Sequence, residues 1–294
     1  MPPDEDALAF YATPGPMTDL HDLDQQIGDL PGDPSEVVTI AQGLVLHRFW
    51  AEAYGVAVPT SREGELQRRS ARSMIERLME MDPRPLPVTR PPEDRFLGNC
   101  RHFSVLTTAL LRSAGIPARA RCGFASYFEK GKWIDHWVVE HWNGDRWVMV
   151  DSQIDDFQRK AIGLVADPGD LPEGLFLTAG EAWMKARAGI EDAERFGILD
   201  MWGQWFIRGN VARDLAALNK VEMLPWDGWG TLARTGETEC DDEYVDAAAA
   251  LALSDDFAAV RHRYEFDPAL HVPCRITSYL AAGPMEVDIP ELAV

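Results

Sequence analysis

The fold of this chain is decided by the stretch that opens with Gly98-Asn99-Cys100-Arg101-His102-Phe103-Ser104. It continues through an apolar run and Gly115-Ile116-Pro117-Ala118-Arg119, passes Asp135-His136-Trp137, and ends with Trp147-Val148-Met149-Val150-Asp151. The cysteine stands at a predicted helix start, the histidine in a predicted strand, and the aspartate at the end of the next strand. Contact among these three side-chain types is the chemistry of acyl transfer to a thiolate, so the stretch predicts a cysteine-dependent enzyme.

A β-hairpin is predicted at Asn143-Gly144, because a type I′ turn needs positive φ at both central residues. If these two residues form the whole loop, Trp142 pairs with Asp145, and the residue numbers of every later pair sum to 287. Then 287 − 136 = 151, so His136 falls opposite Asp151. Directly opposed residues have Cβ atoms roughly 4.5–5.5 Å apart. Asp151 is therefore expected to orient the imidazole of His136.

The same register sets His136 apart from two other candidates. Asp135 and His141 lie an odd number of residues from His136 along the predicted strand, so they are expected on its opposite face. A slip of one residue would exchange the two faces. The choice of His136 and Asp151 therefore depends on the length of the turn.

Cys100 is predicted in the first turn of a helix. Residues 101–113 carry apolar side chains at helical spacing, Gly115 supplies a stop, and Asn99 is an acceptable N-cap. A helix N-terminus favours a thiolate, and the backbone N–H of Cys100 is available to bind an oxyanion. His102 lies roughly 200° around the helix from Cys100, so it is not expected to face the same substrate.

These motifs together resemble the transglutaminase-like superfamily. The matching segments are GNCRHF at 98–103, LLRSAGIPAR at 110–119, DHWVVE at 135–140 and WVMVD at 147–151. The resemblance implies an α+β fold with a papain-like core, in which an antiparallel sheet packs on the nucleophile helix.

The resemblance also implies roles for individual residues. Cys100 matches the nucleophile, His136 the base and then acid, and Asp151 the orienting carboxylate of a Cys-His-Asp triad. A Gln or Trp side chain often completes the oxyanion hole in such enzymes. No motif places that residue here, and the candidates are Gln42, Trp50 and Tyr54.

Composition limits the class of protein. The chain has 294 residues, 46% of them hydrophobic, and a net charge of −20, which argues against nucleic acid or an anionic membrane as a partner. Residues 1–6 lack the basic and apolar character typical of a signal peptide, and no apolar run of about 18 residues occurs, so neither a signal peptide nor a membrane span is expected. We expect a cytoplasmic protein, where a catalytic thiol stays reduced, with a peptide or small amide-containing substrate and no cofactor.

The cysteines and His47 can also be interpreted as structural residues or, for the cysteines, as metal ligands. The four cysteines have no metal-type spacing and are too few for a disulfide framework, so no metal is expected; they are Cys100, Cys122, Cys240 and Cys274. Cys122 is read as a packing residue, and His47 as a structural one. A zinc site built from Cys100, His136 and Asp151 is the weakest alternative.

Three parts are predicted along the chain: an extended N-terminal arm at 1–32, a transglutaminase-like catalytic core at 33–165, and a mainly helical family-specific lobe at 166–294. After the predicted triad, residues 155–170 are expected to form a loop-rich acidic link. The Trp226 and Trp229 rings line an acyl pocket or cover the core. The predicted helices begin and end near residues 33–49, 63–81, 179–189, 198–221, 241–253 and 255–264, with a loose C-terminal tail after them.

Two points of function stay open at this stage. The arginines of 63–81 either pair with the excess acid at a solvated surface or bind an anionic substrate. The reaction is either amide hydrolysis by a peptidase or amidase, which we favour, or amide formation with an amine acceptor. A non-catalytic scaffold that retains the fold is the third hypothesis.

Overall fold

The computed structural model describes residues 4–231, 233 and 241–293, which divide into two compact units. The first unit comprises Met1–Ala120 and Val138–Leu171, and the second comprises Arg121–Trp137 and Pro172–Val294. Each unit is therefore built from two separate stretches of sequence. Strands β3 (Ala118–Ala125) and β4 (Trp133–Trp142) carry the chain from one unit into the other.

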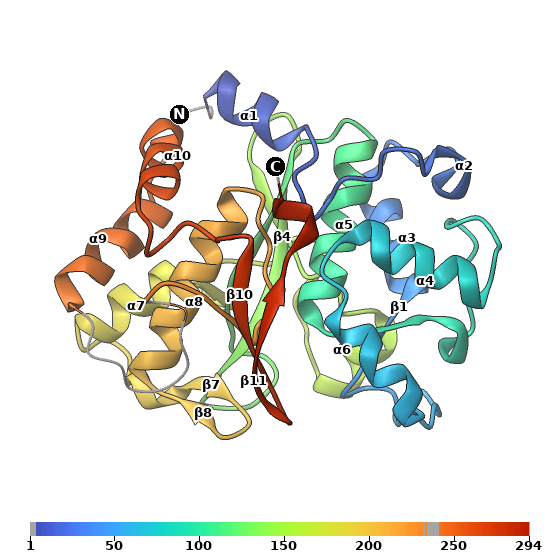
Figure 1. Cartoon of the computed structure of the whole chain (residues 1–294). Coiled ribbons are helices and arrows are strands. Elements are labelled where there is room, and N and C mark those ends of the chain that lie inside the picture. Colours follow the sequence, from blue (N-terminus) through green and yellow to red (C-terminus); the bar gives the residue numbers. More distant parts are fainter. Residues whose placement is uncertain (1–3, 232, 234–240, 294) are drawn as a thin grey trace. The chain divides into compact units, whose positions relative to one another are not determined.

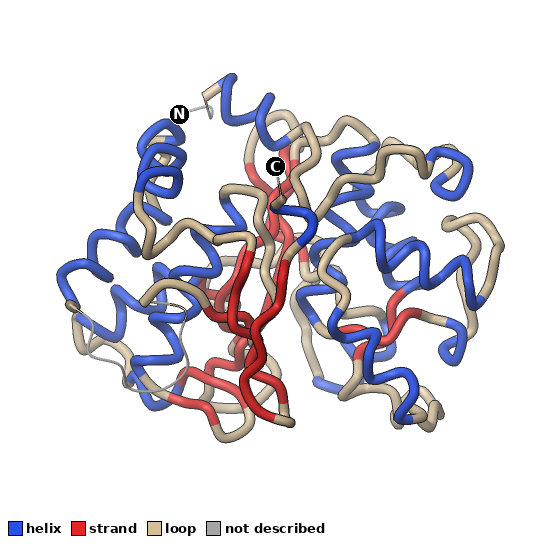
Figure 2. The backbone as a smooth tube through the Cα atoms, viewed as in Figure 1, coloured by secondary structure: helices blue, strands red, loops and turns tan. Residues whose placement is uncertain are grey.

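The architecture is mixed α+β, as predicted. A mainly antiparallel six-stranded sheet has the order β6-β3-β4-β7-β8, with β5 paired to β4. Figure 2 shows the strands in red and the helices in blue. Strand β4 pairs in parallel with β7, whereas β5, β6 and β8 pair antiparallel with their neighbours. The remaining strands of this sheet are β5 (Trp147–Val150), β6 (Phe176–Thr178), β7 (Phe196–Ile198) and β8 (Met201–Trp202).

Helix α5 (Cys100–Ser113) forms the centre of the first unit (Figure 1). Every residue from Cys100 to Arg112 is buried, and α3 and α4 pack against the helix. Beside it lies a two-stranded parallel sheet of β1 and β2. The other elements of this unit are α1 (Glu5–Tyr11), α2 (Asp24–Ile27), α3 (Pro34–Leu44), β1 (Val45–His47), η1 (Thr60–Gln67), α4 (Ala71–Met81), η2 (Pro92–Asp94), β2 (Phe96–Gly98) and α6 (Asp156–Ile162).

The start of α3 is confirmed but its predicted length is wrong. The Asp33 carboxylate accepts from the Ser35 N–H at 2.9 Å, and Pro34 is the first helical residue. The helix ends at Leu44 because the following residues pair with β2 as strand β1. Phe49, predicted on the apolar stripe of this helix, lies beyond β1 and is 63% exposed.

The single helix predicted at 63–81 is two elements. A 3-10 helix, η1, precedes α4, and Ser70 is the N-cap of α4 with its hydroxyl accepting from the Ser73 N–H at 3.4 Å. Serine favours such a cap over a helix interior because its side chain competes for backbone hydrogen bonds. The buried Glu65 carboxylate binds Arg77 at 3.1 Å, so this arginine of the 63–81 segment pairs with acid. It also binds Arg62, which precedes that segment, at 2.8 Å.

Residues 1–32, expected as an extended arm, contain α1 and α2 where the structure describes them. Tyr11 and Met17 are buried, and the Tyr11 ring meets the Trp147 ring edge-to-face at 5.7 Å between centroids. This stretch therefore contributes to the core of the first unit.

The second unit contains the helices predicted after residue 178, but the helix predicted at 198–221 begins only at Gln204, because strands β7 and β8 precede it. The Thr178 and Glu181 side chains form the predicted capping box of α7 (Ala179–Arg187). Trp229 covers the core, since it is 3% exposed and its indole N–H donates to Leu270 O at 3.0 Å. The remaining elements are η3 (Ala193–Arg195), α8 (Gln204–Leu218), β9 (Asp227–Gly228), α9 (Asp242–Ala252), α10 (Phe257–Phe266), β10 (Arg275–Leu280), β11 (Gly283–Asp288) and η4 (Pro290–Leu292).

Two regions predicted to be irregular are ordered elements. Helix α6 lies in the stretch 155–170, which was predicted as a loop-rich link. The C-terminal tail, predicted to be loose, forms the antiparallel hairpin β10–β11, and β10 also pairs with β9. Within the described part of the chain, no helix has the length and apolar character needed to cross a membrane.

Candidate active site

Cys100 is the first residue of α5, as predicted. Asn99 is the N-cap, and its side chain accepts from the His102 N–H at 3.3 Å. The Cys100 side chain is therefore at the positive end of a 14-residue helix, and the residue is only 7% exposed.

His102 is a structural residue of the same helix start. Its Nδ1 accepts from the Asn99 N–H at 3.1 Å, and its Nε2 lies 3.1 Å from Arg68 O, to which it donates. Burial, and then the charge of Arg101, hold the pKa of His102 well below its usual value, so the ring stays neutral. Both nitrogens are engaged in fixing the helix start, which agrees with the expectation that His102 does not face the substrate of Cys100.

The predicted register of the hairpin is wrong by two residues, so the prediction that His136 lies directly opposite Asp151 is also wrong. Trp142 pairs with Trp147 and Val139 with Val150, so the residue numbers in each pair sum to 289. The Asn143 side chain accepts from the N–H groups of Asp145 and Arg146 at 3.0 and 2.9 Å, and Asn143 N–H donates to Arg146 O at 3.2 Å. These bonds close the turn around Gly144 and Asp145 instead of Asn143 and Gly144.

Asp151 follows directly after β5 and is completely buried. Its N–H donates to Pro168 O at 2.8 Å, and its Oδ1 accepts from the Gln153 N–H at 3.0 Å. A backbone donor on the carboxylate stabilises its charged form and fixes its rotamer. This carboxylate is therefore held in a defined position at the end of the strand.

His136 lies in the part of β4 that belongs to the second unit and is 2% exposed. Its ring meets Phe128 edge-on at 4.9 Å between centroids, and Tyr127 at 6.2 Å. The neighbouring Asp135 carboxylate accepts from the Asn210 side chain of α8 at 2.7 Å. Burial raises the pKa of Asp135. The Asp135 side chain therefore binds α8, in keeping with the prediction that it lies on the face of the strand opposite to His136.

The three predicted site residues are thus all buried. Cys100 and Asp151 belong to the first unit and His136 to the second, and their convergence stays a prediction. Among the described residues, no group of three or more His, Cys, Asp or Glu side chains is placed to hold a metal ion. Of the described cysteines, Cys100, Cys122 and Cys274 form no disulfide, whereas Cys240 lies outside the described residues.

The candidates for the second oxyanion donor have other partners. The Gln42 amide donates to Ile154 O at 3.2 Å, and the Tyr54 hydroxyl donates to Asp155 Oδ2 at 2.6 Å. The Trp50 ring packs edge-on against Phe157. Gln42 and Tyr54 therefore anchor the loop that follows Asp151, and the second oxyanion donor stays a prediction.

Two side chains near Asp151 were missed in the sequence. Gln153 and Gln158 are each 2% exposed and hydrogen-bonded to each other at 3.0 Å. A signal existed for Gln158: Asp155 is the N-cap of α6 and accepts from the Gln158 N–H at 2.9 Å, an Asp-x-x-Gln start typical of a helix. No local pattern marks Gln153.

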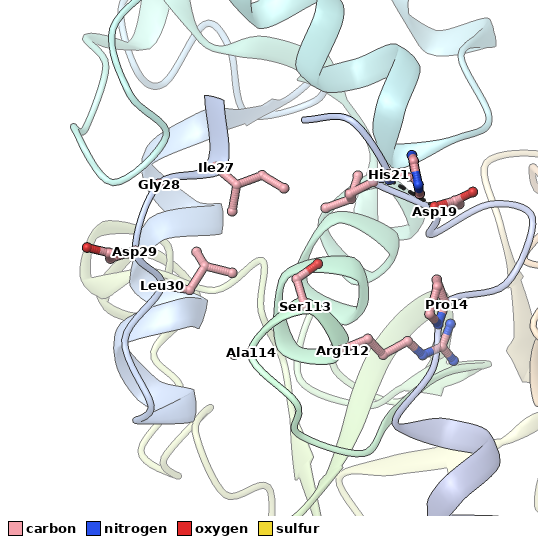
Figure 3. A pocket seen from close by; sticks show the side chains of 11 residues that line it. Pro14, Asp19, His21, Ile27, Gly28, Asp29, Leu30, Arg112, Ser113 and Ala114 are labelled. Carbon is pink, nitrogen blue, oxygen red and sulfur yellow. Dashed lines mark hydrogen bonds between the residues drawn. The ribbon is translucent and has the colours of Figure 1, made fainter. Parts of the chain in front are cut away.

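A pocket of about 610 Å³ lies at the far end of α5 (Figure 3). It is lined by Arg112, Ser113 and Ala114 of the helix end and by residues 27–30 opposite them. Cys100 and Ser113 are 13 residues apart in one helix, which separates them by roughly 20 Å. This pocket is therefore remote from the nucleophile candidate.

Comparison with known proteins agrees with the resemblance seen in the motifs. Residues 66–152 match the sequence profile of the Transglutaminase-like superfamily. A solved structure named as a putative cysteine protease from Cytophaga hutchinsonii is similar at 18% identity and a TM-score of 0.33, over 51% of this chain and 43% of that one. A search of curated protein sequences gives no match. Residues 66–152 of this chain are therefore a transglutaminase-like superfamily domain.

Proposed function

We propose that this protein is a cysteine-dependent acyl-transfer enzyme that cleaves an amide bond through a thioester on Cys100. His136 is the general base and then acid, and Asp151 is the carboxylate that orients it. The observation that carries the proposal is the position of Cys100 at the start of a buried helix inside the matched domain, which also contains His136 and Asp151.

The surroundings of the competing residues support this assignment. His102 is bound at both ring nitrogens within the helix start, and Asp135 is bound to Asn210. Neither has the freedom to serve a thiolate. Glu140, the remaining carboxylate of the matched motifs, accepts from Arg119 Nε at 2.6 Å. His136 and Asp151 are then the histidine and carboxylate left for these roles.

The corrected register also supports the placement of the His136 and Asp151 side chains on the same face of the sheet, on which the triad depends. Side chains alternate along a strand with a period of two, so a shift of two residues returns every side chain to its predicted face. The observed pairing differs from the predicted one by 289 − 287 = 2. A one-residue difference would have turned Asp151 to the face assigned to Asp135.

The reaction follows from these roles. His136 removes the thiol proton of Cys100, and the sulfur attacks the amide carbonyl carbon. The oxyanion of the tetrahedral intermediate is stabilised by the N–H groups at the start of α5. As the carbon–nitrogen bond breaks, the imidazolium gives its proton to the leaving amine. Water, deprotonated by His136, then attacks the thioester, and the acid leaves while the Cys100 thiol is restored.

The proposal extends to the architecture and setting of the domain. Residues 33–165 form a papain-like catalytic core with its sheet against the nucleophile helix, and the later helices form a family-specific lobe. The substrate is a peptide or a small amide, and the net charge of −20 disfavours nucleic acid and anionic membrane as partners. A catalytic thiol is best preserved in the reducing cytoplasm.

The test uses p-nitrophenyl acetate as an activated acyl donor with the full chain. We expect intact-mass spectrometry to find an acetyl group on Cys100, and Cys100→Ala to lower p-nitrophenol release by roughly 10³-fold or more while circular dichroism stays unchanged. Cys274→Ala, at an exposed thiol, is the matched control and should retain activity. Turnover that survives in Cys100→Ala would rule the mechanism out.

Two further measurements separate the alternatives. Addition of butylamine diverts the thioester to an amide if the enzyme is an acyltransferase, whereas a hydrolase still releases mainly acetate. If the protein is a non-catalytic scaffold, Cys100 reacts with iodoacetamide only near pH 8.5, like an unperturbed thiol.

A further inference from the structure

A continuous chain of hydrogen bonds leads away from the Asp151 carboxylate within the first unit. The Gln153 N–H donates to Asp151 Oδ1 at 3.0 Å, and the Gln153 side-chain amide donates to Gln158 Oε1 at 3.0 Å. The Gln158 amide then lies 3.4 Å from the Tyr54 hydroxyl, which donates to Asp155 Oδ2 at 2.6 Å. The chain thus joins the loop after β5, the start of α6 and the segment around residue 54.

Asp155, at one end of this hydrogen-bond chain, determines which atom donates and which accepts in every bond between its side chains. The Asp155 carboxylate caps α6 and can only accept, so the Tyr54 hydroxyl must donate to it. The Tyr54 oxygen then accepts from the Gln158 amide, and Gln158 Oε1 accepts from Gln153. A flip of either glutamine amide would set two donors or two acceptors against each other. The Tyr54 hydroxyl therefore selects one orientation for both glutamines.

At the Tyr54 end of this hydrogen-bond chain, the tyrosine side chain has a hydrogen bond and two ring contacts. Burial, and then the hydrogen bond to Asp155, raise the pKa of Tyr54, so the hydroxyl keeps the proton that it donates. The Phe157 ring lies 4.7 Å from the Tyr54 ring, and the Arg95 guanidinium lies over it at 5.9 Å. The direction of the hydrogen bonds is therefore set by a tyrosine hydroxyl that stays protonated and donates to Asp155.

The Gln153 end has a single anchor. Gln153 Oε1 is buried and has no hydrogen-bond partner within the described part of the chain. Only the bond from its amide nitrogen to Gln158 orients this side chain, which is 2% exposed. A turn of Gln158 would remove this bond from the Gln153 side chain, in the same residue whose backbone N–H donates to Asp151 Oδ1.

We propose that Tyr54, acting through Gln158 and Gln153, is a positioning residue for the Asp151 carboxylate. The proposal rests on the proposed function, in which Asp151 orients and stabilises the imidazolium of His136. That imidazolium in turn favours the Cys100 thiolate at low pH. A loosened Asp151 therefore shows in the reactivity of Cys100, with no substrate required.

The experiment measures the rate of Cys100 alkylation by iodoacetamide between pH 5 and 9 in the full chain, with the site read by peptide mass spectrometry. We expect Tyr54→Phe to lower the rate at pH 6 about tenfold, as loss of a supporting partner of a reactive group commonly does. Tyr244→Phe is the matched control, since it removes a similar 2.7 Å bond, to Asp267 Oδ2, in the second unit. It should leave the rate at the wild-type value.

A double-mutant cycle tests whether Tyr54 acts through Asp151. Asp151→Asn alone should lower the rate at pH 6, and addition of Tyr54→Phe should then have no further effect. Gln153→Ala, which keeps the backbone N–H but removes the side chain, should reproduce the loss if Tyr54→Phe proves hard to fold. Additive losses, or a Gln153→Ala variant with the wild-type rate, would overturn the proposal. A wild-type rate in Asp151→Asn would instead overturn the proposed function.

Discussion

At the scale of single residues, His102 couples the start of the nucleophile helix to pH. Its ring is fully buried and neutral, and the pKa is lowered well below 6.5 by burial. The unfolded chain binds a proton at about pH 6.5, whereas the folded protein resists it until a lower pH. The unfolded state therefore holds more protons in this window, and the free energy of unfolding falls as pH falls below 6.5.

This loss of stability is testable with one substitution. His102→Gln removes the titration, and glutamine at this helix position can still accept from the Asn99 N–H in a capping box. Urea unfolding at pH 7.5, 6.5 and 5.5 should show a slope smaller by up to about 1.4 kcal/mol per pH unit in the variant. His141, whose pKa burial also lowers, should account for part of the remaining slope. An unchanged slope in His102→Gln would contradict this account.

Whether a residue's role can be predicted depends on how far apart in the sequence its interaction partners lie. Cys100, His136 and Asp151 lie in motifs that a few neighbouring residues define, so the sequence alone predicts them as candidates. The partner of Gln158 is Tyr54, 104 positions earlier, and the two meet only through the tertiary fold. No local sequence pattern predicts such a contact. The hydrogen bonds that join Gln153, Gln158 and Tyr54 therefore could not be predicted from the sequence.

At the scale of elements, α8 is fastened to β3 by a buried ion pair. The Asp214 carboxylate accepts from Arg121 Nε and Nη2 at 3.0 and 2.8 Å and from the Cys122 N–H at 2.9 Å. Asp214 is completely buried and Arg121 is 5% exposed. Removal of one partner leaves a charge without compensation in the interior, which is far more costly than the loss of a surface pair.

Asp214→Asn should therefore lower the free energy of unfolding by about 3–5 kcal/mol. The matched control is Asp288→Asn, which breaks a similar two-bond pair with Arg275 at the surface. Its urea midpoint should stay close to the wild-type value, because exposed pairs are screened by water. Equal losses in the two variants would show that burial of the Arg121 pair has no special weight.

The elements also show why strand pairing was harder to predict than helix starts. A helix N-cap is a local contact, and the Asp33, Asn99 and Thr178 caps were all visible in sequence. The β10–β11 hairpin pairs Leu280 with Gly283 and so turns through two alanines, without an Asn-Gly or Asp-Gly signal. Its strands were therefore read as a loose tail.

At the scale of the whole molecule, the two compact units follow pairing between strands and not the order of the sequence. Each unit joins two separate stretches, and β3 and β4 contribute to both. Composition along the chain reports local changes in polarity, so it suggests boundaries between continuous segments only. Long-range pairings such as Gly123 with Thr178 determine which segments belong together.

The net charge of −20 makes the molecule's stability depend on salt in a predictable direction. The 48 acidic residues exceed the 28 basic ones, so the folded chain concentrates like charges that the unfolded chain spreads apart. Between 0.01 and 0.1 M salt the Debye length shrinks from about 30 Å to about 10 Å, which screens this repulsion. Salt also weakens exposed ion pairs, but each of those contributes only about 0–1 kcal/mol.

Repulsion should therefore dominate, and the unfolding temperature should rise by a few degrees, on the order of 2–4 °C, between these salt concentrations at pH 7.5. Tryptophan fluorescence can follow the transition, with NaCl and KCl compared to exclude a specific ion. At pH 5, close to the isoelectric point of about 4.7, the net charge is small and the rise should vanish. A fall in unfolding temperature with salt at pH 7.5 would mean that ion pairs such as Arg187–Asp242 outweigh the excess negative charge.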